Sequence, residues 1–375
     1  MIVPMRIVIT GGHGFVGTEL TRELLGRGRF RDRAITALVP ADRFEPRADP
    51  AHVAPYGPTV VGDLTDTLPR LFSSPVDVVF HLASAVSAEC ERDFDLGMRV
   101  NLETTRAVLE AARAQAVNGG PLVTVVFSSS VAVYGADPAL PLPPVVSERT
   151  LPTPQSSYGA QKLACETLIA DYTRKGYVDG RPVRLMTVAI RPGAPNAAAS
   201  GFVSGIVREP LAGLETPCPV PPDLLLAIAS PRRTVAGLLA VAEAARGTGP
   251  GRLTGRIPVN LPALTVSVGD ILQSLRRIAG DAVADRVRPE PDPRTEDIVR
   301  SWPARFDNAR AAALGLAPDP DIDSVIEQYL QDHPEAVVHA PPGPLDDGAG
   351  ERHGRETRGA GETRPENDAG PPGLL

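Results

Sequence analysis

The first half of the chain alternates short apolar runs with segments whose apolar residues recur at helical spacing. Met5–Thr10 is rich in Ile and Val, the pattern of a strand buried on both faces. A helix is predicted over Gly14–Leu25, where Gly26 and Gly28 then stop the pattern. Further strands are predicted at Ala34–Val39, Thr59–Val61, Asp77–Leu82, Leu122–Phe127 and Val183–Ile190, and further helices at Met98–Ala116 and Ser157–Arg174. This alternation predicts an α/β fold with a doubly wound parallel sheet.

The texture of the sequence changes after Arg191, where proline and glycine break the pattern into shorter elements. Helical patterns recur near Thr234–Arg246, Val268–Ala279 and Ile322–Gln331, which predicts a smaller mixed α/β cap. We assign residues 1–190 to the sheet domain and 191–338 mainly to the cap, with some segments returning to the sheet domain. Residues 339–375 have too few apolar side chains to offset chain entropy by burial, so a disordered tail is predicted.

Composition and charge exclude several classes of protein. The chain has 375 residues, of which 42% are hydrophobic and 22% charged, as in an ordinary soluble protein. Its net charge is -7 and it has no basic stripe interleaved with aromatics, so nucleic acid is not an expected partner. No apolar run has membrane-spanning length and the N-terminus shows no signal-peptide pattern, so we expect a cytoplasmic protein without a membrane partner.

Cysteines and lysines are few. Three cysteines, Cys90, Cys165 and Cys218, are too scattered for a zinc knuckle or a disulfide framework, and no metal site is predicted. Of the 38 basic residues only two are lysines, Lys162 and Lys175. A lysine retained in a chain that otherwise uses arginine indicates a site that needs a compact ammonium.

A glycine-rich turn joins the first predicted strand to the first helix. Gly11, Gly14 and Gly17 have the spacing of a dinucleotide-binding turn. The first glycine allows a tight bend, the second admits a pyrophosphate, and the third lets helix and strand pack closely. The helix opens at Phe15 and Val16, where unpaired N–H groups would face the phosphates. The turn therefore predicts a Rossmann-type domain that binds a dinucleotide.

The end of the second predicted strand bears on the choice of cofactor. A dinucleotide fold usually places Asp or Glu there to bind the adenosine ribose, but Pro40 occupies that position. Asp42 lies two residues later and would reach the ribose, whereas Arg43 would pair with a 2′-phosphate. NAD is predicted, with NADP left open. At the end of the third strand, Asp63 and Leu64 are candidates for contact with the adenine, and Asp63 is equally well placed to cap a loop.

Tyr158 and Lys162 form a pattern that indicates catalysis. They are four residues apart in a predicted helix, so their side chains share one face. A free tyrosine has a pKa of about 10, and a neighbouring ammonium favours the phenolate and brings that pKa toward neutrality. Tyr158 is therefore a candidate base and Lys162 its activating cation, with an exposed surface pair as the alternative.

Hydroxyl and amide groups from other elements complete the candidate site. Ligands bind at the carboxyl ends of parallel strands, which points to the serines that follow Leu122–Phe127. Ser130 is the preferred partner of Tyr158, and Ser129 is the second choice. Asn101, inside a predicted helix, is a candidate to hold a water in a proton relay, with a solvated side chain as the alternative.

Together these motifs resemble the extended short-chain dehydrogenases/reductases of the NAD-dependent epimerase/dehydratase family. The likeness spans residues 5 to about 330 and rests on TGGHGFVG, GDL at 62–64, HLAS at 81–84, RVNLETTR at 99–106, FSSSVAVYG at 127–135, SYGAQK at 157–162 and RPG at 191–193. It implies that Ser130, Tyr158 and Lys162 are a catalytic triad. The cofactor contacts that it implies beside the glycine turn and the triad come from Leu82, Ala83, Ser84, Asn101, Ser129, Arg191 and Pro192.

The cap carries a closer resemblance, to the D-erythronate dehydrogenases. It rests on RPGAPNAAASGFVSGIVREPLAGLETPCPVPPD, on SPRRTV at 230–235 and on SWPARFDNARAAALGL at 301–316. This likeness implies an NAD-dependent oxidoreductase that oxidises the C2 hydroxyl of a four-carbon sugar acid to a 2-oxo acid.

A sugar acid needs a counter-ion and hydroxyl contacts. A guanidinium grips a carboxylate in two places, and Arg232 is the first candidate for this role, Arg208 the second. Asn196 or Ser84 would contact the hydroxyls. The reacting oxygen itself would be held by the triad residues Ser130 and Tyr158.

Two other functions use the same cofactor. A nucleotide-sugar epimerase would have the same triad but would keep its cofactor bound and release no NADH. A regulatory module that binds NAD(P) without turnover typically lacks the tyrosine or the lysine, and both are present here. A dehydratase is disfavoured because Val131 and Ala132 stand where that chemistry needs acids. The expected partner is a small sugar acid, and the expected assembly is a homodimer.

Overall fold

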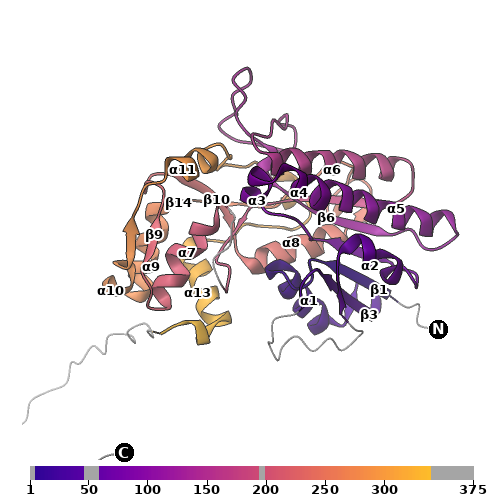
Figure 1. Ribbon diagram of the computed structural model, residues 1–375, viewed down its shortest axis with the longest axis horizontal. Coiled ribbons are helices and arrows are strands. Elements are labelled where there is room, and N and C mark those ends of the chain that lie inside the picture. Colours follow the sequence, from indigo (N-terminus) through magenta and orange to yellow (C-terminus); the bar gives the residue numbers. More distant parts are fainter. Residues whose placement is uncertain (1–4, 46–58, 194–198, 339–375) are drawn as a thin grey trace, which may run out of the picture. The chain divides into compact units, whose positions relative to one another are not determined.

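An eight-stranded, largely parallel sheet forms the framework of the N-terminal half (Figure 1). The structure is a computed structural model that describes residues 5–45, 59–193 and 199–338. The strands of this sheet are β1 (Met5–Thr10), β2 (Arg29–Phe30), β3 (Arg33–Asp42), β4 (Val60–Val61), β5 (Val78–His81), β6 (Thr124–Ser130), β7 (Asp179–Leu185) and β13 (Val259–Asn260). Their order is β13-β7-β6-β5-β1-β3-β2, and β4 also pairs with β3. All neighbours in this sheet pair in parallel except β2 with β3, so the predicted doubly wound parallel sheet is confirmed.

Helices cover both faces of this sheet. One face packs against α1 (Phe15–Arg27) and α8 (Pro231–Glu243), and the other against α2 (Leu64–Leu71), α5 (Thr104–Val117) and α6 (Ser157–Arg174). Successive residues of β1 point to opposite faces, because Ile7 and Ile9 join the first core and Val8 joins the second. A strand that is buried on both faces must be apolar on both, which explains why β1 lacks polar alternation.

The chain passes from this large sheet to a smaller one at Met186. The prediction of a single strand over Val183–Ile190 is wrong, since β7 ends at Leu185 and β8 (Thr187–Val188) pairs with a strand of the smaller sheet. The apolar run is continuous across the break, so periodicity could not reveal it. Residues 185–188 therefore lie where the two sheets meet.

The remaining segments build a smaller mixed α/β part. Strands β8, β10 (Leu225–Ala229) and β14 (Leu264–Ser267) form a three-stranded sheet, β9 (Thr216–Cys218) pairs with β15 (Val287–Pro289), and β11 (Ala245–Arg246) pairs with β12 (Arg252–Leu253). The further helices of the chain are α3 (Ser87–Arg92), α4 (Phe94–Gly97), α7 (Gly201–Leu211), α9 (Val268–Ala279), α10 (Asp281–Ala284), α11 (Pro293–Arg300), α12 (Ala309–Ala312) and α13 (Ile322–Asp332). Two short 3-10 turns lie at Val131–Val133 and Pro334–Ala336. Figure 1 shows α7, α9 and α13 gathered beside the smaller sheet. These helices and β10 form one apolar core, which contains Ile206, Ile228, Leu275 and Ile326.

The helix predicted over Met98–Ala116 begins in an unexpected way. Met98–Glu103 is a π-helix, and α5 starts only at Thr104. Such wide turns are rare and are frequent at functional sites. This one carries the buried side chain of Asn101.

Several predictions fall on the limits of the described residues. The tail at 339–375 and Asn196 lie outside them. The predicted boundary between the sheet domain and the cap, at residue 190, stays a prediction. Contacts between residues do not separate the two parts, because they group Met1–Pro341 into one unit. Within the described ranges, no helix is both long and apolar enough to cross a membrane.

Candidate active site

The glycine turn between β1 and α1 leaves the N-terminus of the helix open. Gly14 precedes α1, and no side chain caps this helix end. Gly11 has a φ of 69°, and a Cβ there would lie 2.7 Å from the backbone nitrogen of Ala83. A Cβ on Gly17 would collide with the carbonyl oxygen of Gly11. Glycine is therefore required at both positions, and the N–H groups of the first helical turn remain available to a phosphate.

Two cavities meet at this turn. The first, of about 380 Å³, holds the predicted cofactor contacts Asp42, Asp63, Leu64 and Ala83. The second, of about 310 Å³, holds Phe15, Val16, Gly17, Ser129, Ser130, Tyr158, Lys162 and Arg191. Both are lined by Gly11, Gly14, Leu82 and Ser84. The residues thus fit a dinucleotide that crosses the turn with its phosphates at the shared glycines, at the point where the strand order reverses between β1 and β5.

Asp42 supplies a carboxylate at the end of β3 despite the displacement by Pro40. It accepts the backbone N–H of His13 at 3.0 Å and that of Phe44 at 3.2 Å, and it lines the 380 Å³ cavity. Arg43 lines the same cavity, with its guanidinium 5.9 Å from the centroid of the Phe44 ring. An acid that faces a ribose favours NAD, because it repels a 2′-phosphate.

Asp63 caps a helix and also lines the cavity in which the adenine contact was predicted. Its carboxylate caps α2 by accepting the N–H of Thr65 at 3.0 Å, and it also lines the 380 Å³ cavity next to Leu64. Hydrogen bonds from the Thr65 hydroxyl and N–H lower the pKa of Asp63, which keeps this carboxyl charged.

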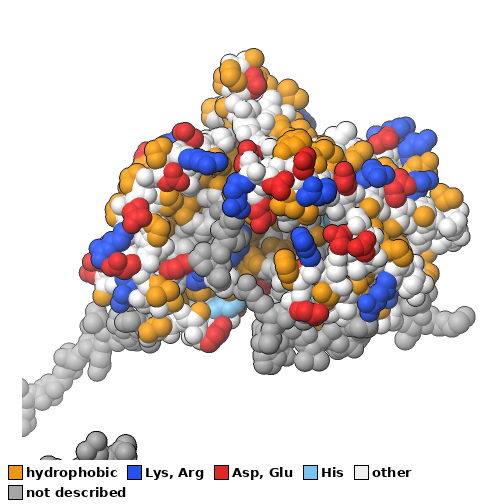
Figure 2. All heavy atoms as spheres, in the orientation of Figure 1, with side chains coloured by type: hydrophobic (Ala, Val, Ile, Leu, Met, Phe, Trp, Pro, Cys, Tyr) orange, Lys and Arg blue, Asp and Glu red, His pale blue; other side chains and the backbone are white. Residues whose placement is uncertain are grey.

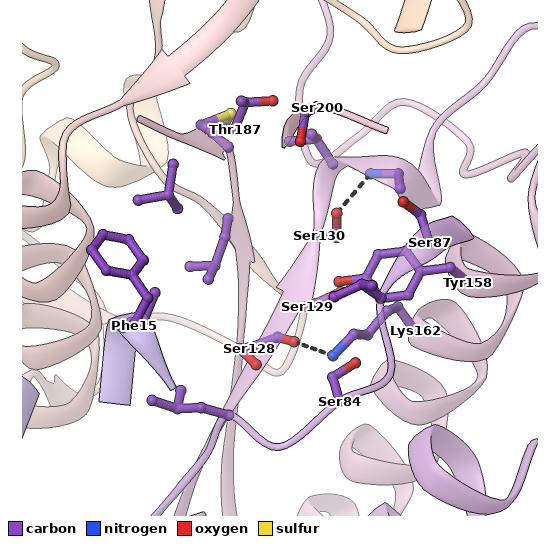
Figure 3. Close-up of a pocket in the computed structure, with 18 of the residues that line it drawn as sticks. Phe15, Ser84, Ser87, Ser128, Ser129, Ser130, Tyr158, Lys162, Thr187 and Ser200 are labelled. Carbon is purple, nitrogen blue, oxygen red and sulfur yellow. Dashed lines mark hydrogen bonds between the residues drawn. The ribbon is translucent and has the colours of Figure 1, made fainter. Parts of the chain in front are cut away.

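Tyr158, Lys162 and Ser130 come together in the 310 Å³ cavity (Figure 3). The ammonium nitrogen of Lys162 lies 5.4 Å from the centroid of the Tyr158 ring and donates a 2.8 Å hydrogen bond to the carbonyl oxygen of Ser128. Ser130 Oγ accepts the N–H of Ala132 at 3.1 Å, and the Ser130 hydroxyl is among the groups that act to lower the pKa of Tyr158. Lys162 is 1% exposed, which does not fit an exposed surface pair.

Burial dominates the protonation of this pair. It raises the pKa of Tyr158 to about 12, although serine hydroxyls and the charge of Arg191 act in the opposite direction. Burial also lowers the pKa of Lys162 to about 8, although Cys165, Cys90 and Glu166 act to raise it. At neutral pH the protein alone therefore holds Tyr158 as a phenol and Lys162 as an ammonium. The expectation that Lys162 brings the tyrosine toward neutrality is not met by the protein alone, because desolvation outweighs the nearby charges.

The three serines that end β6 have different partners. Ser129 Oγ donates to the carboxylate of buried Glu166, and Ser128 Oγ donates to the carbonyl oxygen of His81 at 3.2 Å. Of the three, Ser130 is the serine whose hydroxyl acts on the pKa of Tyr158. Of the two serines considered from the sequence, Ser130 therefore has its hydroxyl at the tyrosine, whereas Ser129 is turned away from it.

Asn101 is buried and fully engaged with protein groups. Its Oδ1 accepts the Ser84 hydroxyl at 2.9 Å and the Ala85 N–H at 2.8 Å, and its Nδ2 donates to Gln161 Oε1 at 2.8 Å. This geometry does not support the expected water-holding role, and it also rules out the solvated alternative. Asn101 instead holds Ser84, which lines both cavities and whose hydroxyl also acts to lower the pKa of Tyr158.

Arg191 brings a guanidinium to the catalytic cavity. Burial and the charge of Arg208 lower the pKa of Arg191, whereas Tyr158 acts in the opposite direction. Arg208, the second candidate for substrate binding, donates from α7 to the Arg191 carbonyl oxygen at 2.7 Å and pairs with Glu209. It does not line the cavity and instead holds the segment that carries Arg191.

Arg232 does not face either cavity, contrary to the expectation from the sequence. It lies on α8 with its side chain 51% exposed, and its guanidinium pairs with the carboxylate of Asp332 on α13. The pairing partner lies 100 residues away, so the sequence could not reveal it. Pro192 also lines neither cavity.

Several residues of the catalytic cavity were not singled out from the sequence. They include Val86, Ser87, Leu185, Met186, Thr187, Val188, Ser200 and Trp302. Figure 3 shows Thr187 and Ser200 across the cavity from Lys162. Met186 to Val188 line the catalytic cavity because the chain passes from the large sheet to the smaller one there. No pattern in the sequence predicted this change of sheet. Trp302 stood inside a motif that supported the family resemblance, and this was the available signal.

The described residues offer no metal site, since no three His, Cys, Asp or Glu side chains among them are placed to hold an ion. All three cysteines are free and buried. Acidic and basic side chains are interspersed over the face drawn in Figure 2. The polar side-chain groups that line the catalytic cavity are therefore hydroxyls, one ammonium and one guanidinium.

Comparison with known proteins agrees with this geometry. Residues 7–225 match the NAD dependent epimerase/dehydratase family. The chain is 47% identical to the D-erythronate dehydrogenase of Cupriavidus necator over 335 residues, which cover 88% of this chain and 98% of that protein. It is 39% identical to the D-erythronate dehydrogenase of Haemophilus influenzae, over 87% of this chain and 99% of that protein. A solved structure named nucleoside-diphosphate-sugar epimerase, from Agrobacterium tumefaciens, is 36% identical with a TM-score of 0.79, over 89% of this chain and 96% of that one.

The comparisons settle the class of the protein. The family match, over more than half of the chain, gives NAD as the cofactor, and two dehydrogenase relatives that align over most of their length agree with a small-molecule substrate. They confirm the resemblance drawn from the sequence motifs. The chain belongs to the NAD-dependent epimerase/dehydratase family and is an NAD-dependent oxidoreductase.

Proposed function

We propose that the protein oxidises the C2 hydroxyl of a four-carbon sugar acid of the D-erythronate type to the 2-oxo acid by a Ser-Tyr-Lys mechanism. The observation that carries this proposal is a single cavity lined by Ser130, Tyr158 and the half-buried Arg191. A 2-hydroxy acid has its hydroxyl and its carboxylate on adjacent carbons, so it would meet the tyrosine and the arginine together. The names of the 47% and 39% identical relatives support this substrate class.

Arg191 is the counter-ion that we assign to the substrate carboxylate, in place of Arg232. Among the described residues that line this cavity, Arg191 and Lys162 are the basic ones, and none is acidic. The ammonium of Lys162 is already bonded to the Ser128 carbonyl. A guanidinium that has lost part of its hydration in a cavity binds a carboxylate through two parallel hydrogen bonds.

The protein's own residues account for the proton. Tyr158 would take the proton of the C2 hydroxyl, while Ser130 donates a hydrogen bond to the same oxygen. The charges of Lys162 and Arg191 favour the phenolate that this step requires. When bound, NAD would supply the hydride acceptor and a positive charge that favours the phenolate. One hydride thus leaves C2 and one proton leaves its oxygen for each turnover.

A nucleotide-sugar epimerase is the second candidate, because the 36% identical structure from Agrobacterium carries that name. A neutral sugar ring, however, would offer no anion to the half-buried guanidinium of Arg191. The third alternative, an NAD(P)-binding module without turnover, would typically lack Tyr158 or Lys162, and both are present in the cavity.

The test is to incubate the purified protein with NAD or NADP and a panel of four- to six-carbon aldonates and nucleotide sugars. Formation of reduced nicotinamide is followed by absorbance, and condensation of the product with o-phenylenediamine reports a 2-oxo acid. We expect NADH and a 2-oxo acid from D-erythronate and no NADH from nucleotide sugars. Interconversion of a nucleotide sugar, with no reduction by any acid, would overturn the proposal.

A further inference from the structure

A buried polar cluster lies next to the catalytic cavity and takes no part in the proposed proton transfer. It consists of Ser129 from β6, Tyr134 directly after the 3-10 turn Val131–Val133, Glu166 from α6 and Arg184 from β7. Each of these residues is at most 4% exposed. Burying two charges so completely is costly unless all their hydrogen bonds are made. A buried ion pair is therefore weak evidence for stability alone, and we expect this cluster to have a role in the site.

The centre of the cluster is a bidentate ion pair. Arg184 donates from Nε to Glu166 Oε1 at 2.8 Å and from Nη2 to Oε2 at 2.6 Å. Its Nη1 donates to the hydroxyl of Tyr134 at 2.5 Å, and that hydroxyl donates to the Ser147 carbonyl at 2.9 Å. Glu166 also accepts the hydroxyl of Ser129. The carboxylate is therefore fixed from two sides and cannot rotate freely.

The cluster is joined to the catalytic residues by position. Tyr158, Lys162 and Glu166 follow one another at intervals of four residues on α6, so all three lie on one helix face. Ser129 lies directly opposite Arg184 in the pairing of β6 with β7. It also lies between Ser128, whose carbonyl holds Lys162, and Ser130. Fixing Ser129 thus fixes both of its neighbours.

Glu166 also bears on the charge around Lys162. The titratable groups that face this ammonium are His81 from β5, Cys90 from α3, and Tyr158, Cys165 and Glu166 from α6 itself. Burial and the charge of Lys162 lower the pKa of His81 to about 3, and burial raises the pKa of both thiols, so these three groups are neutral at pH 7. Within the described part of the chain, Glu166 is the carboxylate among the groups that face Lys162.

We infer that Glu166, clamped by Arg184, is a positioning residue of the reaction, which anchors the end of β6 through Ser129 and faces the Lys162 ammonium with a negative charge. The inference rests on the proposed roles of Tyr158, Lys162 and Ser130. It separates two effects, one of geometry through Ser129 and one of charge through the carboxylate, and each can be removed alone.

The charge effect can be read directly because the chain contains only two lysines. Protein labelled with 13C-lysine gives one ε-carbon signal for Lys162 and one for Lys175, which serves as an internal reference. In the wild type we expect the Lys162 signal to titrate near the pH of about 8 that the structure indicates. In Glu166→Gln a negative charge is lost, so this titration should move at least half a pH unit lower, and the alkaline limb of the kcat profile should move with it.

The geometry effect is read in Ser129→Ala, which leaves the ion pair intact and is expected to fold even where the glutamate variant does not. Its kcat should fall about 3- to 30-fold, since small displacements of reacting groups are costly. Its Lys162 titration and the KM for NAD should stay unchanged. Asp179→Asn is the matched control, because Asp179 pairs with Arg181 at the other end of β7. This variant should lower the Tm and leave the kcat profile unchanged.

An unchanged Lys162 titration in Glu166→Gln, or a wild-type kcat in Ser129→Ala, would overturn the corresponding half of the inference. If Glu166→Gln does not fold, a wild-type kcat in Ser129→Ala alone overturns the positioning role. The NMR titration needs neither substrate nor cofactor, so it stays readable even if the proposed substrate is incorrect.

Discussion

The two walls of the catalytic cavity hold their polar groups in different ways. On the side of the large sheet, reacting groups are tied to buried partners, as Lys162 is to the Ser128 carbonyl and Ser84 is to Asn101. On the side of the smaller sheet, Arg191 is fixed through its backbone, and its guanidinium meets no acid among the described lining residues. The difference suggests a division of labour, in which one wall keeps the reacting groups in place and the other keeps a charge available to an anion.

The largest effect is expected on the sheet wall, from Tyr158→Phe. Removing a general base typically costs about 100- to 10,000-fold in rate, and we expect kcat to fall within this range. Binding of NAD, measured by calorimetry, should change less than about threefold, because Tyr158 is one of many groups that line the groove. Substantial residual turnover would mean that another group moves the proton.

The opposite wall is probed by Arg191→Met. A hydrogen bond to a charged group contributes roughly 1.5 to 3 kcal/mol, so the KM for an acid substrate should rise about 10- to 100-fold. A neutral analogue of the same length should be affected far less. Arg232→Met is the matched control, since its exposed ion pair with Asp332 should leave both constants within about twofold. Equal effects on acid and neutral substrates would remove the carboxylate role.

On the side of the large sheet, buried His81 should make the free energy of unfolding depend on pH. This ring is 1% exposed and lies between the hydroxyls of Thr10, at 2.7 Å, and Thr105, at 3.0 Å. Burial and the charge of Lys162 lower the pKa of His81 from 6.5 to about 3. The unfolded chain therefore binds a proton before the folded one does, and the free energy of unfolding falls as the pH drops from 6.5 toward 3.

At pH 4.5 this deficit should reach about 2 to 3 kcal/mol relative to pH 7. Urea unfolding at the two pH values measures it, and the variant His81→Gln should lose most of this part of the difference. The same pH dependence in the variant would assign the acid sensitivity to other groups.

The smallest effect concerns the cofactor end of the sheet wall. Asp42→Asn removes the charge that would repel a 2′-phosphate, while its single amide oxygen can still accept one of the two N–H groups, from His13 and Phe44, that the two carboxylate oxygens accept. We expect the preference for NAD over NADP, taken from kcat/KM, to fall about tenfold. Arg43→Ala in the same background should reduce any NADP activity that appears. A preference that does not move would mean that Asp42 does not contact the ribose.

The sheet wall could be predicted from the sequence because its chemistry follows local spacing. Three glycines after a strand, and a tyrosine one helical turn before a lysine, fix geometry within a single element. Glu166 lies a further four residues along the helix, so the spacing in the sequence could have indicated it. Its pairing with Arg184, on another element, could not be predicted from that spacing. Local periodicity also failed where a break leaves the apolar pattern intact, as at Met186, and where a π-helix turns Asn101 inward.

The cap wall could not be predicted because its contacts join distant parts of the chain. Arg232 and Arg191 are chemically identical, and neither local sequence says which one is paired elsewhere. Asp332 decides this by neutralising Arg232 across the space between α8 and α13. With so many arginines in the sequence, the one that has no acid beside it in the cavity could be found only from the fold.

Trp302 gives the molecule a built-in optical reporter. It is the single tryptophan of the chain, and it lines the cavity that holds Tyr158 and Arg191. Emission excited at the red edge of the indole band thus arises from this one place, with no background from elsewhere in the protein. Binding of a sugar acid or of the nicotinamide ring can therefore be followed in the unmodified chain, by quenching or by energy transfer to NADH.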